Sequence, residues 1–176
     1  MKLLKVWVLS LTVVIGLNAC STTENTVTEI EPISIFPSWY KNVEFTSDSL
    51  GYSGYATAIA VDSTKAIQRA VAQARIHLEK KIAQLTEEIR LEFKESGSND
   101  AENADFIIIL RTAHAGVVEN AKVSETISSK LDGYYRGFAS VEISKSEVRS
   151  TLEKGFTGHP RYWGGFSESP MFATYF

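Results

Sequence analysis

A single apolar stripe constrains the fold of this chain more than any other feature. Between Asp62 and Glu95, apolar side chains recur at steps of three and four residues, which is the spacing of one face of an α-helix. Asp62 or Ser63 supplies a suitable N-cap. The stripe comprises Ile67, Val71, Ala74, Leu78, Ile82, Leu85, Ile89 and Phe93. Such a helix is on the order of 50 Å long, so its far end needs a partner beyond one small sheet.

The residues just before this helix predict a strand with one face of small side chains. The strand runs from Leu50 to Val61, and its small face consists of Gly54, Ala56, Ala58 and Ala60. The opposite face carries Ser53, Tyr55, Thr57 and Ile59. A matching small ridge on the first half of the helix is formed by Ala66, Ala70 and Ala74. We therefore expect the helix backbone to lie very close to this strand.

A second helix is predicted after the break at residues 96–100. Asn99 or Asp100 caps the segment from Ala101 to His114, whose centre is a continuous apolar run. Periodicity alone does not separate a buried helix from a buried strand here. The length of the segment and its cap favour the helix.

The next two segments predict a hairpin. Residues 116–128 and 134–143 alternate in polarity and flank a turn at residues 131–133. The first of these segments carries Val117, Ala121, Val123 and Ile127 on one face, interrupted by Glu119 and Glu125. A short helix capped by Ser144 or Ser146 then ends at Gly155. The predicted fold class is α+β: a small antiparallel three-stranded sheet wrapped around one long helix, with a second helix and a short C-terminal helix.

Residues 155–176 form an aromatic C-terminal tail. Its aromatic side chains are Phe156, Tyr162, Trp163, Phe166, Phe172, Tyr175 and Phe176. The tail is too aromatic for a disordered segment and too irregular for a predicted helix. We expect it to pack on the domain or on a neighbouring molecule.

The N-terminus predicts a lipid anchor. Residues 1–19 combine Lys2 and Lys5 with a short apolar run, as in a secretory signal peptide, and the run is too short to span a bilayer. The Leu-x-Ala-Cys sequence ending at Cys20 resembles a bacterial lipobox, which implies acylation of Cys20, for example with palmitate. Ser21 is compatible with sorting to the outer membrane. The expected location is the cell outer membrane, facing the periplasm, with residues 20–35 as a flexible tether.

Composition restricts the classes of function. The chain has 176 residues, and removal of the first 19 leaves 157, enough for one domain, residues 36–154, followed by the tail. Loss of Lys2 and Lys5 changes the net charge from −3 to −5, which disfavours nucleic-acid binding. The only cysteine is used for the anchor, and no metal-ligand, phosphate-loop or nucleophile motif is present. The sequence therefore predicts no enzyme activity, no metal and no cofactor.

The second face of the predicted sheet is the candidate binding surface. Its members include Tyr55, Ile59, Tyr134 and Phe138, which make it more apolar than a solvated face. Three coverings are open: the aromatic tail, another copy of the chain, or a foreign partner. We expect partners among a second copy or other envelope proteins, besides the membrane itself.

The order of elements resembles the LPP-twenty family of envelope lipoproteins, which includes flagellar accessory relatives. The residues that carry the resemblance are 37–39 (Pro-Ser-Trp), 52–56 (Tyr-Ser-Gly-Tyr-Ala), Ala66, Ala70, Ala74, Arg75, Leu78, and residues 134–143 and 145–152. The resemblance implies a dodecin-like arrangement of the sheet around the long helix. It also implies a non-catalytic structural or assembly role in the envelope, with a flagellar accessory component as its sharper form. The alternative is a binding module for an envelope ligand such as peptidoglycan.

Overall fold

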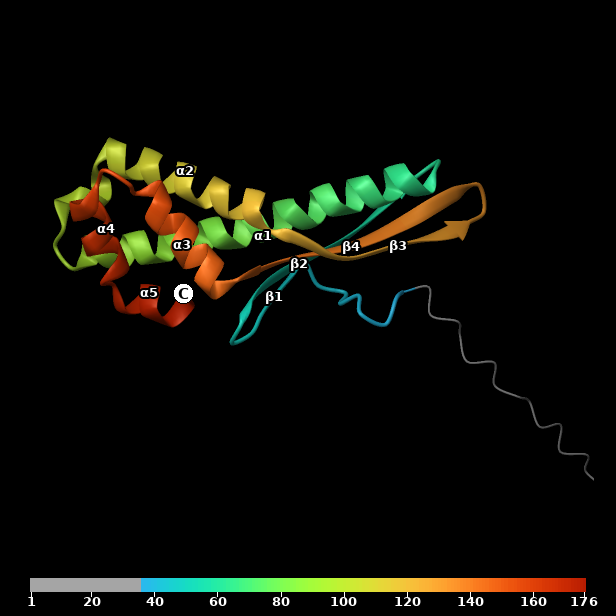
Figure 1. Cartoon of the computed structure of the whole chain (residues 1–176), viewed down its shortest axis with the longest axis horizontal. Helices are drawn as coiled ribbons and strands as arrows, with labels where there is room; N and C mark the ends of the chain where they lie inside the picture. The colour runs from blue at the N-terminus through green and yellow to red at the C-terminus, as the bar shows by residue number, and fades with distance from the viewer. Residues whose placement is uncertain (1–35) are drawn as a thin grey trace, which may run out of the picture. The chain divides into compact units, whose positions relative to one another are not determined.

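Helix α1 (Ser63–Glu95) is the element against which most of the described chain packs. The computed structural model describes residues 36–176. The signal peptide, Cys20 and the tether lie outside the described residues. The sheet lies along the N-terminal half of α1, and four further helices gather around its C-terminal half (Figure 1). The expectation that the far end of α1 needs a second partner is therefore confirmed.

Helix α1 begins and ends at clear signals. The side chain of Asp62 accepts a hydrogen bond from the N–H of Lys65 at 2.8 Å, which confirms the predicted N-cap. Ser96 closes the helix, and Gly97 follows with a φ of 93°. The buried stripe consists of Ala66, Ala70, Ala74, Leu78, Ile82, Leu85, Ile89 and Phe93. In the first half the alanine ridge, rather than Ile67 and Val71, is the fully buried line.

The described residues contain an antiparallel sheet of four strands, in the order β1-β2-β4-β3. The strands are β1 (Phe45–Ser47), β2 (Gly51–Ala60), β3 (Lys122–Leu131) and β4 (Tyr134–Ser144). The α+β class is confirmed, whereas the expected number of three strands is wrong. The additional strand, β1, has only three residues, too few to show an alternating pattern in the sequence.

Two glycines allow the sheet to approach α1 closely. A Cβ at Gly54 would overlap the carbonyl oxygen of Ala74, and one at Gly137 would overlap the backbone carbonyl of Ala66. The register pairs Ala56 with Ala139 between these glycines. The predicted close contact between the small strand face and the alanine ridge is therefore confirmed. We call the face of the sheet that contacts α1 the inner face.

The chain between α1 and the hairpin is more helical than expected. A short 3-10 helix, η1 (Asn99–Glu102), leads into α2 (Ala104–Asn120), which is capped by Asn103. Helix α2 thus includes residues 116–120, for which a strand was predicted, and β3 starts only at Lys122. Val117 and Ala121 are four residues apart, a spacing that places two residues on one face in both a helix and a strand. The sequence therefore could not distinguish the helical period from the strand period where α2 ends and β3 begins.

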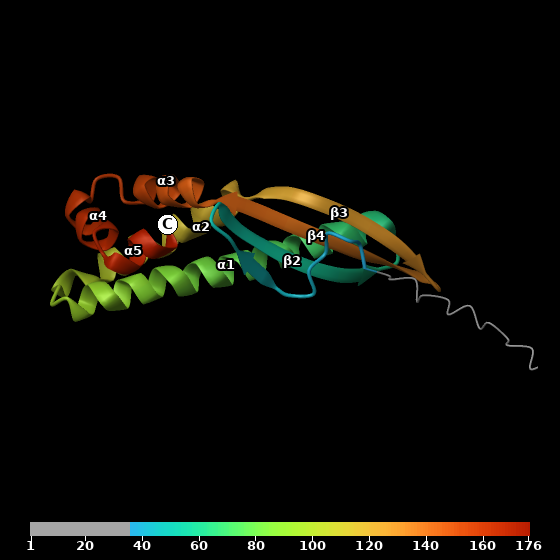
Figure 2. The same cartoon turned by 90° about the horizontal axis from the view of Figure 1, so that it is seen from below.

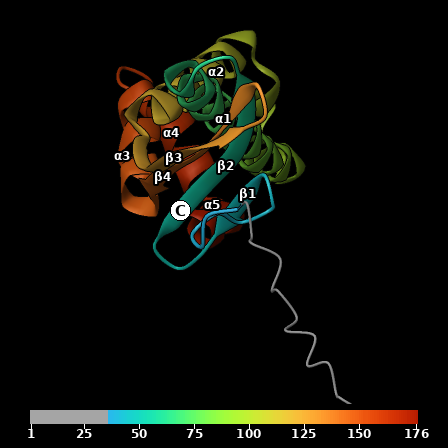
Figure 3. The ribbon, with the colours of Figure 1, turned by 90° about the vertical axis from the view of Figure 1, so that its right-hand side faces the viewer.

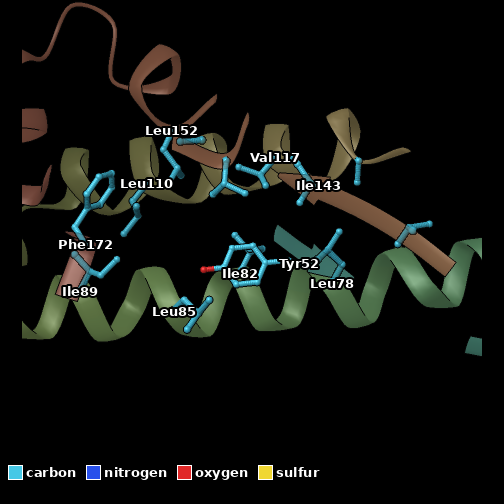
Figure 4. Close-up of a cluster of buried hydrophobic side chains, with 14 of the residues drawn as sticks. Tyr52, Leu78, Ile82, Leu85, Ile89, Leu110, Val117, Ile143, Leu152 and Phe172 are labelled. Atoms are coloured by element: carbon cyan, nitrogen blue, oxygen red, sulfur yellow. The ribbon is translucent and has the colours of Figure 1, made fainter. Parts of the chain in front are cut away.

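The aromatic tail packs on the domain, as expected, but it does so as helices, contrary to expectation. It follows α3 (Lys145–Gly155) and forms α4 (Pro160–Ser167) and α5 (Pro170–Tyr175), each with proline in its first turn. The rings of Phe156 and Phe166 lie 5.6 and 6.0 Å from that of Phe106 on α2. Phe172 on α5 is buried against α1, and Figure 4 shows it beside Ile89 of that helix. The core therefore continues from the sheet to the C-terminus.

The contact at Gly137 gives a prediction for stability. Gly137→Ala should lower the free energy of unfolding by about 1–3 kcal/mol, because the added methyl group forces β4 away from the backbone of Ala66. Gly164→Ala on α4 is the matched control, because a Cβ there meets open space. Denaturant unfolding of both variants measures the difference. Equal stability of the two variants would contradict the close contact.

Candidate interaction surface

The outer face of the sheet is the face turned away from α1. Register places residues of β2, β4 and β3 in rows across it, because directly paired residues point to the same side of a sheet. One such row contains Thr57, Phe138 and Ile127, and the next contains Ile59, Arg136 and Ser129. Figure 3 shows the domain from one end, with α1 running alongside the strands.

The centre of the outer face is covered by the segment that opens the described chain. The ring of Phe138 lies 5.7 Å from the ring of Phe36 and 5.1 Å from the ring of Tyr40, and Tyr40 also contacts Tyr55. Phe138 is 0% exposed and Tyr55 is 6% exposed. Burial raises the pKa of the Tyr40 hydroxyl, partly offset by the charge of Arg136. Two of the four predicted binding residues, Tyr55 and Phe138, are therefore inaccessible on the described surface.

The cover is thus residues 36–44, and the aromatic tail does not contribute to it. The sequence contains a signal for this cover, since Phe36, Trp39 and Tyr40 directly precede the sheet. The tail instead packs at the far end of α1, where Tyr175 donates a hydrogen bond to Glu88 at 2.6 Å. Each of the two aromatic segments covers a different part of the domain.

The other two predicted binding residues are exposed. Ile59 is 48% exposed and Tyr134 is 36% exposed, and Ile127 joins them with 44%. Ile127 was expected on the same strand face as Val123. The register shift between Val123 and Glu125 reverses this, since Val123 pairs with Val141 on the inner face and Ile127 pairs with Phe138 on the outer face. We call Ile59, Ile127 and Tyr134 the apolar patch.

The two sides of the sheet differ in their accessibility: one ends in the short strand β1, beyond which the rest of β2 forms the edge, and the other ends in β3. On the β2 edge, the N–H of Tyr55 donates to Glu44 O at 2.9 Å, and the carbonyl of Tyr55 accepts from His77 Nδ1 at 2.7 Å. Farther along, Arg69 donates to the carbonyl of Ile59 at 3.0 Å. These contacts close much of the β2 edge. On the β3 edge, no strand within residues 36–176 pairs beyond β3, which follows the margin of the sheet in Figure 2.

A hollow on the described surface lies where β3 begins and β4 ends. It has a volume of about 510 Å³, and its charged lining residues are Asp48, Lys122, Glu142 and Glu147. Three of these charges already have structural contacts: Lys122 pairs with Glu147 at 3.0 Å, and Asp48 accepts from the N–H groups of Leu50 and Gly51. The Lys122–Glu147 ion pair at this hollow therefore links β3 to α3, and these charges do not form a free acid–base pair.

Glu147 also completes the capping box of α3. Its carboxylate accepts from the side chain and the N–H of Ser144, and the Ser144 side chain accepts from the N–H of Glu147. Hydrogen bonds from the Ser144 side chain, from Lys122 and from the Ser144 backbone lower the pKa of Glu147 to about 2. This carboxylate stays ionised far below neutral pH.

The three histidines lie in separate surroundings. His77 Nε2 is 2.8 Å from the Gln73 amide nitrogen and 3.8 Å from Glu44. Burial lowers the pKa of His114, and His159 stacks on Tyr162 with ring centroids 5.8 Å apart. Among residues 36–176, no group of three or more His, Cys, Asp or Glu side chains is placed to hold a metal ion. Glu119 on α2 and Glu125 on β3 do not share the strand face on which they were predicted.

Comparison of the chain with protein-family models, with curated proteins and with solved structures found no match in any of the three. No helix within the described residues has the length and hydropathy needed to cross a membrane.

The pKa of Glu147 predicts a pH-dependent contribution to stability. A carboxyl whose pKa is lower in the folded than in the unfolded chain stabilises the fold above its unfolded pKa, and this contribution disappears as the pH falls. Glu147→Gln should therefore be less stable than the wild type at pH 7, and the difference should shrink between pH 4.5 and about 2. Denaturant midpoints measured across this range test it, with Glu153→Gln on the same helix as control. A difference independent of pH would contradict the assignment.

Proposed function

We propose that this protein is an outer-membrane-anchored lipoprotein with a non-catalytic, structural role, which assembles with itself and with other envelope proteins. The observation that carries the proposal is the apolar patch beside the open edge of β3. Exposed apolar side chains next to unpaired strand groups are a characteristic of surfaces that contact other proteins. The sharper form of the proposal is membership of the LPP-twenty family and a flagellar accessory role.

A lipid on Cys20 would strengthen such an assembly. Anchoring restricts the domain to a layer near the membrane, which raises its local concentration and makes weak contacts effective. The domain itself supplies a rigid scaffold, because its core runs from the sheet through α1 to the tail helices. An anchored domain with a rigid core is suited to assemble with other copies through the edges of their sheets.

The assembly role is tested with the full-length lipoprotein extracted in mild detergent. Light scattering after size exclusion should give a protein mass above that of one chain. Ile127→Ser should lower this mass, because it removes exposed apolar area from the patch beside the open edge. Ile76→Ser is the matched control, since Ile76 is exposed on α1. A strict monomer at high concentration would contradict assembly, and retention on purified sacculi would favour the alternative role in wall binding.

The flagellar form has a separate test. Deletion of the gene should impair swimming in soft agar, and reintroduction of the wild-type gene should restore it. Normal swimming of the deletion strain would exclude a flagellar role and leave the general assembly role in place.

The lipid anchor gives its own prediction. Cys20→Ser should abolish the incorporation of labelled palmitate and move the protein out of the membrane fraction, because the modified thiol is lost. Ser21→Ala keeps Cys20 and should remain labelled and membrane-bound. Palmitate labelling of the Cys20→Ser variant would show that the lipid is attached elsewhere.

A further inference from the structure

We propose that β3 pairs antiparallel with β3 of a second copy of this chain, with Ile127 of one copy opposite Ile127 of the other. This inference rests on the proposed assembly role and names the contact that the assembly uses. It joins the two four-stranded sheets into one sheet of eight strands.

The backbone of β3 offers unpaired groups at alternate residues. The N–H of Lys145 donates to the carbonyl of Leu50 at 2.9 Å, so the odd-numbered residues at this end of β4 bond toward β2. Because bonding direction alternates along a strand, the even-numbered residues, including Phe138, bond toward β3. Ile127 is paired with Phe138 and thus bonds toward β4. The residues that direct N–H and C=O groups out of the sheet are Thr126, Ser128 and Lys130.

Symmetry limits the possible registers. A two-fold axis perpendicular to the sheet keeps both outer faces on the same side, so paired residues must point to the same face. The axis must then pass through a residue of β3, and the central candidates are Thr126, Ile127 and Ser128. With the axis at Thr126, Glu125 faces Ile127 of the second copy on the outer face, which places a carboxylate against an apolar side chain. With the axis at Ser128, Ile127 faces the polar Ser129.

The register centred on Ile127 combines favourable pairs. Ile127 meets its own copy as a non-hydrogen-bonded pair, in which side chains approach most closely. Thr126 and Ser128 of the two copies form the flanking pairs, and both direct backbone groups toward each other. On the outer face the next pairs join Glu125 of each copy to Ser129 of the other. Between residues 125 and 129 the contact therefore has an apolar centre, and no like charges face each other.

The opposite side of the sheet does not offer an edge equivalent to β3. Its outermost strand, β1, has only three residues, and beyond β1 the carbonyls of Tyr55 and Ile59 on β2 accept from His77 and Arg69. A two-fold contact through β3 uses the same edge of both copies. The product is therefore a closed dimer rather than a fibre.

Cysteine cross-linking in the membrane tests the register with the full-length lipoprotein. Ile127→Cys should form a disulfide-linked dimer on mild oxidation, because the facing Cβ atoms of such a pair lie about 4.5–5.5 Å apart. Glu125→Cys and Ser129→Cys are matched controls on the same strand face. Each lies about four residues from its own copy, roughly 13 Å along the strand. Neither control should cross-link alone, whereas the two expressed together should cross-link to each other.

A proline tests the backbone contact independently. The N–H of Ser128 points out of the sheet, so Ser128→Pro removes no bond to β4 but blocks pairing at the open edge. In the Ile127→Cys background, Ser128→Pro should reduce the cross-linked fraction to the level of the single-cysteine controls. Circular dichroism of the variant should match that of the wild type and show that the fold is retained.

The outcomes separate this inference from the proposed function. Cross-linking of all three single-cysteine variants to the same extent, or of none, would overturn the β3 contact. If the extracted lipoprotein still has a mass above one chain in that case, the assembly role stands and uses another surface. A strict monomer would contradict both the β3 contact and the proposed assembly role. A disulfide between Ile127→Cys and a different protein would show that the edge takes a foreign strand instead.

Discussion

The close contact between the alanine ridge of α1 and the glycines of the sheet is the constraint on which the rest of the structure depends. Gly54 and Gly137 bring β2 and β4 against the backbone of α1, without side chains between them. Such an approach fixes the position of the sheet on the first half of the helix. The second half is then left with large apolar side chains, which only additional helices can cover. The arrangement of α2, α4 and α5 follows from this division.

The same constraint gives the two faces of the sheet different roles. The inner face of β2 and β4 packs on α1, so contacts with another molecule are left mainly to the outer face and to the edges. Residues 36–44 cover the middle of the outer face through Phe36 and Tyr40. Side chains of α1 occupy the β2 edge. The apolar patch and the β3 edge are what remains accessible, which is why the proposed contacts concentrate there.

The elements that could be predicted from the sequence are those with a long, regular pattern. The stripe of α1, the small face of β2 and the cap at Ser144 each depend on local chemistry, and the structure confirms them. The accessible surface could not be predicted in the same way. The position of Ile127 depends on a register shift at β3, and the burial of Tyr55 and Phe138 depends on Phe36 and Tyr40 folding back over the sheet. Both are consequences of tertiary packing, which leaves no periodic signal.

The position of Phe36 has a geometric consequence for the proposed dimer. Phe36 packs on Phe138, so the described chain enters the domain on the outer face. A two-fold axis perpendicular to the joined sheet keeps both outer faces on one side. The two described chains would therefore enter such a dimer on the same side of the sheet, whereas pairing about an axis within the plane of the sheet would place them on opposite sides.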